Sequence, residues 1–76
     1  HLYTMKKIKK IKIKVNGKVT GINQNTNLLN LIKNLQISIK KVAIELNQEI
    51  VDKKKLNTIN LKNNDKIEIV HFIGGG

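Results

Sequence analysis

Apolar and lysine residues alternate with a period of two from Ile11 to Val15, and a second short stretch follows from Lys18 to Ile22. This period is typical of a strand that buries one of its two faces. The two stretches are joined by Asn16-Gly17, a pair that tolerates the positive φ angles of a type I′ turn. We therefore expect the chain to open with a β-hairpin.

The next segment has apolar residues spaced by three and four positions, which predicts a helix of about ten residues with one apolar stripe. Asn25, Thr26 and Asn27 precede it and are candidate N-caps, because their side chains can accept hydrogen bonds from the first helical N–H groups. The stripe would pack the helix onto the sheet, and it consists of Leu28, Leu29, Leu31, Ile32 and Leu35.

The second half of the chain predicts three more strands. Alternation over 42–46 is followed by a turn at Asn47-Gln48 and by a short strand over 49–51, and 53–56 favours a short helical turn. Asn63-Asn64-Asp65 predicts a further turn. In the last strand, Ile67, Ile69 and His71 share one face, whereas Glu68, Val70 and Phe72 share the other.

The predicted order is therefore β-β-α-β-β-β, which places the chain in the α+β class. A helix laid across a mixed sheet is the β-grasp arrangement. If the final strand pairs in parallel with the first, it lies centrally in the sheet and anchors the chain just before its C-terminal residues.

Composition limits the function classes. With 76 residues, 39% of them apolar, the chain can form one small domain with one modest core. The longest apolar runs are far shorter than the roughly 18 residues that a membrane-spanning helix needs. The chain has no cysteine, which excludes disulfides, thiolate metal ligands and thiol chemistry. We expect residues 1–4 to be an expression remnant ahead of Met5, 5–73 to form the domain and 74–76 to form a flexible tail.

The net charge of +10 arises from 15 lysines without a single arginine. Lysine, isoleucine and asparagine together fill 39 of the 76 positions, which is typical of the codons of an AT-rich genome. Nucleic-acid binding favours arginine and aromatic side chains, and here only Tyr3 and Phe72 are aromatic. Compositional drift is therefore favoured, and a lysine-rich nucleic-acid-binding module is an alternative that salt-sensitive retention on nucleic acid would reveal.

Side chains that could carry out catalysis are few. His1 belongs to the expected remnant, and His71 is better explained as a strand residue than as a base or a ligand. The remaining polar candidates show no triad, carboxylate pair or metal-ligand spacing, so we predict no catalytic residue and no metal site. They are Ser38, Glu45, Glu49, Asp52, Asp65 and Glu68.

The C-terminal residues are the remaining candidates for chemistry. Val70 and Phe72 lie on the face turned away from the helix, which makes them candidate partner-binding residues, with simple partial burial as an equal alternative. Gly74, Gly75 and Gly76 lack Cβ atoms, so they could extend through a narrow passage and leave the terminal carbonyl carbon unhindered. An adenylating partner could convert the carboxylate to an acyl-adenylate. From these residues alone, an unstructured end without function is an equal alternative.

Two long segments resemble a known family. Residues 42–51 and 64–76 closely resemble the ThiS family of sulfur carrier proteins from thiamine biosynthesis, and the hairpin over 11–18 resembles the opening strand of that family. The similarity extends over essentially the whole chain from Met5. Its ending is specific, because a strand, His71-Phe72 and the three glycines coincide at the last residues.

The resemblance implies a ubiquitin-like β-grasp fold and a protein co-substrate rather than an enzyme, with no bound cofactor. Gly76 would be adenylated by an E1-like ThiF enzyme using ATP, converted to a thiocarboxylate with sulfur from the persulfide donor of a cysteine desulfurase system, and used by the thiazole synthase ThiG. Gly74 and Gly75 would let the tail extend far enough to place Gly76 in the active site of a partner. The setting would be a bacterial cytoplasm or a plastid stroma.

The resemblance also implies that the tail docks on its partners through Val70, Phe72 and Ile73.

Some positions depart from the family pattern: Gln48 and Asn64 stand where glycine is common. Asparagine tolerates left-handed backbone geometry better than glutamine does. Asp52 replaces a common proline.

The nearest alternative is the molybdopterin-synthase small subunit, which shares the fold, the glycine ending and the thiocarboxylate chemistry. That subunit generally carries prolines shortly before its glycines, and this chain has no proline. A ubiquitin-like modifier that conjugates to proteins or thiolates transfer RNA is disfavoured further, because the ending from Asp65 to Gly76 fits the thiazole branch better.

Overall fold

The computed structural model describes residues 9–73. The expected remnant, Met5 and the three C-terminal glycines lie outside the described residues, so the domain boundaries at residues 5 and 73 and the flexible tail stay predictions.

The described residues form five strands, one α-helix and two 3₁₀ helices, and the predicted order β-β-α-β-β-β is confirmed. The 3₁₀ helix η1 was not predicted, whereas η2 includes the expected helical turn and extends to Thr58. The elements are β1 (Lys10–Val15), β2 (Lys18–Asn23), α1 (Leu28–Asn34), η1 (Ile39–Lys41), β3 (Val42–Leu46), β4 (Glu49–Ile50), η2 (Lys53–Thr58) and β5 (Lys66–His71).

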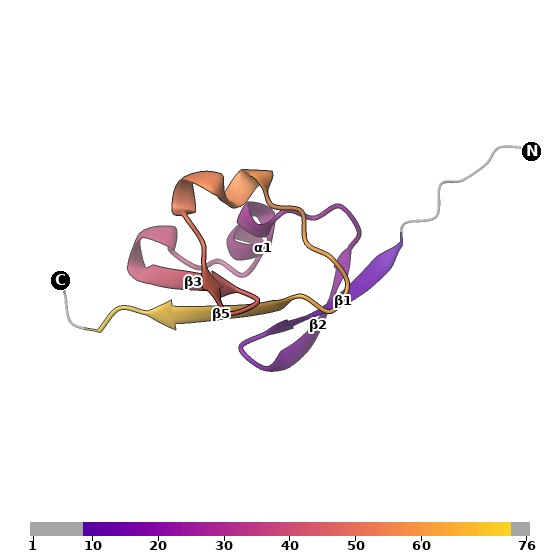
Figure 1. Cartoon of the computed structure of the whole chain (residues 1–76), viewed down its shortest axis with the longest axis horizontal. Coiled ribbons are helices and arrows are strands. Elements are labelled where there is room, and N and C mark those ends of the chain that lie inside the picture. The colour runs from indigo at the N-terminus through magenta and orange to yellow at the C-terminus, as the bar shows by residue number, and fades with distance from the viewer. Residues whose placement is uncertain (1–8, 74–76) are drawn as a thin grey trace, which may run out of the picture.

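The five strands form one mixed sheet in the order β2-β1-β5-β3-β4. β5 pairs in parallel with β1 and antiparallel with β3, so the last strand lies at the centre, as expected for a β-grasp fold. Figure 1 shows α1 and η2 on one side of this sheet, with β5 in yellow running along the length of the molecule. The other side of the sheet, which we call the outer face, has no helix of the described residues over it.

The local signals for the hairpin and the helix start were correct. Asn16 and Gly17 have φ angles of 50° and 81°, as a type I′ turn requires. Asn27 is the N-cap of α1, and its side chain accepts a hydrogen bond from the backbone N of Asn30 at 2.8 Å.

The predicted length of the helix was wrong. α1 has seven residues rather than about ten, with Leu35 as its C-cap. Gln36 then adopts a φ of 59°. A residue in the left-handed region ends an α-helix, because its backbone can no longer continue the i to i−4 hydrogen bonds.

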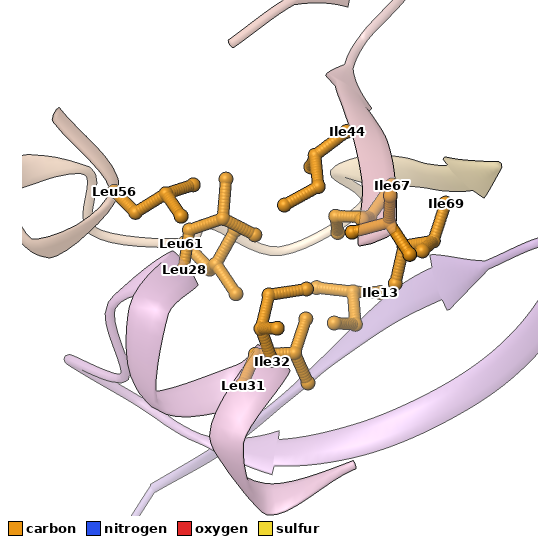
Figure 2. Close-up of a cluster of buried hydrophobic side chains, with 10 residues drawn as sticks. Ile13, Leu28, Leu31, Ile32, Ile44, Leu56, Leu61, Ile67 and Ile69 are labelled. Carbon is orange, nitrogen blue, oxygen red and sulfur yellow. The ribbon is translucent and has the colours of Figure 1, made fainter. Parts of the chain in front are cut away.

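The core lies between α1, η2 and the inward face of the sheet. Figure 2 shows the helix side chains Leu28, Leu31 and Ile32 pointing toward the isoleucines of the strands. Leu56 from η2 and Leu61 from the following loop close one end of the core. The buried residues are Ile13, Leu28, Leu31, Ile32, Val42, Ile44, Leu56, Leu61, Ile67 and Ile69.

Candidate functional site at the C-terminal strand

β5 leads to the C-terminal residues, and its backbone is held on both sides. β1 pairs with its start, at Lys14↔Lys66 and Val15↔Ile67. On the other side, the pairing with β3 extends to Val42↔His71. Beyond this pair, the backbone N of Phe72 donates a hydrogen bond to the carbonyl of Lys41 at 2.9 Å. The sheet therefore fixes the direction of the chain as far as Phe72.

Asn16 continues the pairing of β5 where β1 ends. Its backbone N donates to the carbonyl of Ile67 at 2.8 Å. Its side chain then bonds both backbone groups of Ile69: the N–H of Ile69 donates to Oδ1 at 2.7 Å, and Nδ2 donates to the carbonyl at 3.2 Å. A side-chain amide has the same donor and acceptor as a peptide group, so Asn16 substitutes for one more strand residue.

Sequence reasoning assigned Asn16 only to the turn and missed this second role. No local signal could have revealed it, because the bonded residues are separated by 53 positions in the chain.

The two faces of β5 differ as predicted, up to His71. Ile67 and Ile69 are buried, at 0% and 6% exposure, whereas Val70 and Phe72 on the outer face are 56% and 59% exposed. Ile73 is fully exposed. His71 is exposed rather than buried with the two isoleucines, although its pairing partner Val42 in β3 is a core residue.

We call Val70, Phe72 and Ile73 the exit surface. Large apolar side chains that are exposed next to one another are typical of protein interaction sites. The Phe72 ring has a cation as its neighbour, since Nζ of Lys53 lies 5.1 Å from the ring centroid. Sequence reasoning did not select Ile50, a further exposed apolar residue of the outer face. Ile50 is 78% exposed and pairs with Glu45, and Glu45 pairs with Glu68.

The carboxylates near the turns have structural tasks. Asp65 accepts hydrogen bonds from Nδ2 of Asn47 at 3.0 Å and from the backbone N of Lys62 at 2.8 Å. Asp52 caps η2 by accepting from the backbone N of Lys54 at 2.9 Å. In residues 9–73, no three His, Asp or Glu side chains come together in a way that could hold a metal ion.

The surface hollows are lined by lysine, amide, hydroxyl and apolar side chains. One lies beside the hairpin, against Lys12, Lys14 and Val19, and is lined on its other side by Lys66 and Asn64. This hollow and two others in residues 9–73, one against Thr20 and Leu35 and one against Gln24 and Asn60, include no carboxylate or histidine. No helix in this part of the chain is long and apolar enough to cross a membrane.

Of the predicted site residues, the structure brings Val70, Phe72 and Ile73 together at the end of the central strand. Gly74, Gly75 and Gly76 lie outside the described residues. The feature that the fold builds is therefore a supported strand end with an exposed apolar surface, directly followed in sequence by three glycines.

Known proteins resemble the chain in sequence and in fold. The sequence model of the ThiS family matches residues 13–76. The "Sulfur carrier protein ThiS" of Bacillus subtilis is 37% identical over 65 residues, which cover 84% of this chain and 98% of that protein. A "Thiazole synthase" of Magnetococcus marinus is 38% identical over 66 residues, but these cover only 20% of its length and 87% of this chain.

The crystal structure of a thiamine biosynthesis protein (ThiS) from Geobacter metallireducens superimposes with a TM-score of 0.76 at 28% identity, covering 87% of this chain and 100% of that one. The matched region includes β5, the exit surface and the three glycines, since it extends to residue 76. The chain therefore belongs to the ThiS family.

Proposed function

We propose that this protein is a sulfur carrier for the synthesis of the thiazole moiety of thiamine, and that Gly76 carries the sulfur. The observation that supports this most directly is the position of β5: the strand that precedes the glycines is the central strand of the sheet and ends in an exposed apolar surface. A rigid strand can present the tail to a partner while the exit surface docks beside it.

The proposed chemistry takes place at the C-terminal carboxylate. A carboxylate resists nucleophilic attack because of its negative charge, so a ThiF-like E1-type partner would first use ATP to form an acyl-adenylate on Gly76. AMP is a good leaving group, and the terminal sulfur of a persulfide from a cysteine desulfurase system would displace it to give an acyl disulfide on Gly76. A second thiol of that system would then attack the S–S bond, which releases the thiocarboxylate and leaves a disulfide on the sulfur donor. The chain has no cysteine, so it offers no thiol of its own to carry the sulfur.

The sulfur would then pass to a thiazole synthase of the ThiG type. The similarity to one fifth of the Magnetococcus protein named thiazole synthase supports this partner, because segments that work together are often joined in one polypeptide. In this scheme the protein is a co-substrate and not an enzyme, with no bound cofactor, and it acts in a bacterial cytoplasm or a plastid stroma. Membership of the ThiS family favours this role over that of a molybdopterin-synthase small subunit.

The central test is the intact mass of the protein after incubation with its adenylating enzyme, ATP and a persulfide source. We expect the mass to rise by the difference between one sulfur and one oxygen atom, and we expect no change when ATP is omitted. An unchanged mass in the presence of an enzyme that is shown to consume ATP with another carrier would reject the proposal.

A second prediction concerns the position of the terminal carbon. Deleting Gly76, or adding one residue after it, should abolish thiocarboxylate formation, because the partner's active site receives a carboxylate at one fixed distance from the exit surface. The urea unfolding midpoint should stay the same, since residues 9–73 contain the whole described core. Transfer at the normal rate by the extended chain would contradict the prediction.

A further inference from the structure

Five lysines lie on η1 and η2, the two elements that contact Phe72 just after the end of β5. The carbonyl of Lys41 accepts the hydrogen bond from Phe72, and Lys40 precedes it in η1. Lys53 lies over the Phe72 ring and begins η2, where Lys54 and Lys55 follow it. All five side chains are exposed. We call Lys40, Lys41, Lys53, Lys54 and Lys55 the exit lysines.

Acidic residues are scarce at this end of the molecule. Glu45 and Glu68 pair with each other across the middle of the sheet, and Glu68 is four residues, or about 13 Å of strand, before Phe72. Asp65 precedes β5, and Glu49 pairs with Leu46 at the far end of β3. Only Asp52 adjoins the exit lysines in sequence, and it caps η2.

The end of β5 therefore combines an apolar centre with a positively charged rim. The two parts are coupled, because Lys53 contacts Phe72 and Lys41 is bonded to its backbone. A partner that binds Phe72 would therefore lie close to the ammonium group of Lys53 and to the backbone of Lys41. Such a surface is complementary to an apolar contact with carboxylates around it.

This arrangement fits a protein better than a nucleic acid. A phosphate backbone would neutralise the lysines, but it offers no apolar surface for Val70 and Ile73. The chain also lacks arginine, which commonly supplies bidentate contacts to phosphates.

We propose that the adenylating partner carries acidic residues around the opening that accepts the C-terminal tail, and that the exit lysines recognise them. The inference rests on the proposed function. Charges at the rim of an interface mainly increase the rate of association, and salt screens their effect. The exit lysines would thus guide the tail toward the opening before the exit surface docks.

The test compares two double variants of the full chain that have the same net charge. Lys41→Glu with Lys53→Glu alters the exit lysines, and Lys12→Glu with Lys14→Glu is the control. Each replacement removes two charge units, so both variants fall from +10 to +6. Lys14 pairs with Lys66, which is six residues or about 20 Å of strand from Phe72.

The measurement is the association rate constant with the adenylating enzyme from the same genome, at low and at high salt. We expect the exit variant to associate about tenfold more slowly at low salt and the control to change less than about threefold. At about 0.5 M salt the variants and the parent should converge. Circular dichroism and urea unfolding would check that both variants remain folded, and Lys53→Arg should keep the parent rate because it retains the charge.

Equal slowing of the two double variants would overturn the inference, because it would show an effect of net charge rather than of position. An exit variant that associates with the enzyme at the parent rate would also overturn it. If that same variant were no longer retained on duplex DNA, the exit lysines would bind nucleic acid instead. These outcomes are distinct from a failure of the proposed function, in which the parent protein itself would not be adenylated.

Discussion

At the scale of single residues, asparagine occupies most of the turn positions that have a left-handed backbone. In residues 9–73, six residues other than glycine have a positive φ. Four are asparagines (Asn16, Asn25, Asn47 and Asn64) and two are glutamines (Gln36 and Gln48). Asparagine is among the side chains that best tolerate the left-handed region. The two positions where the family often has glycine, 48 and 64, are both left-handed here. Gln48 and Asn64 therefore adopt a backbone geometry that glycine favours.

Asn16 allows a prediction that separates its two roles. Asn16→Gly keeps the positive φ of the turn, which glycine adopts without strain, but removes the amide that bonds Ile69. We expect it to lower the free energy of unfolding by about 1 to 2 kcal/mol, because both backbone groups of Ile69 lose a partner in a partly buried position. Urea unfolding would measure this. A neutral or stabilising effect would show that the turn is the only role of Asn16.

At the scale of elements, one face of β5 packs in the core, and the other face is predicted to bind a partner. Ile67→Ala should lower the free energy of unfolding by about 3 kcal/mol, because it leaves a cavity at a fully buried site. Phe72→Ala should cost less than about 1 kcal/mol, since the ring is more than half exposed and loses chiefly its contact with Lys53.

The two variants should rank in the opposite order for association with the adenylating enzyme. Phe72→Ala should weaken binding, whereas the folded fraction of Ile67→Ala should bind as the parent does. Urea unfolding and a binding titration on the same preparations would compare the two properties. If Phe72→Ala lost stability and binding to an equal degree, Phe72 would be an ordinary structural residue.

At the scale of the whole molecule, a small core has to hold together a chain of high net charge. Ten buried side chains form the core in the part of the chain that the structure describes, and the net charge of the chain is +10. Like charges even lie side by side, since Lys14 pairs with Lys66 in the sheet. Mutual repulsion of this kind destabilises the compact state, and salt screens it.

The urea midpoint should therefore rise when sodium chloride is increased from about 20 mM to about 500 mM, where the Debye length falls well below 10 Å. Urea is uncharged, so it leaves the electrostatic effect visible. The control variant Lys12→Glu with Lys14→Glu should show a smaller rise, because its net charge is lower. A midpoint that falls with salt would indicate that attractive ion pairs outweigh the repulsion.

The sequence by itself determined the kind and order of the strands and of the α-helix. The alternation in β1 and β5, the Asn16-Gly17 turn and the Asn27 cap involve neighbouring residues, and the backbone responds to them locally. The C-terminal glycines and Val70, Phe72 and Ile73 were also identified as candidate functional residues from the sequence.

Only the tertiary structure decided how these parts combine. The parallel pairing of β5 with β1 was conditional in the sequence, and the amide of Asn16 on Ile69 and the contact of Lys53 with Phe72 were not visible there. These contacts join segments that are far apart in the chain. Local patterns specify which face of a strand is apolar, but the choice of neighbour depends on how all the apolar faces pack into one core.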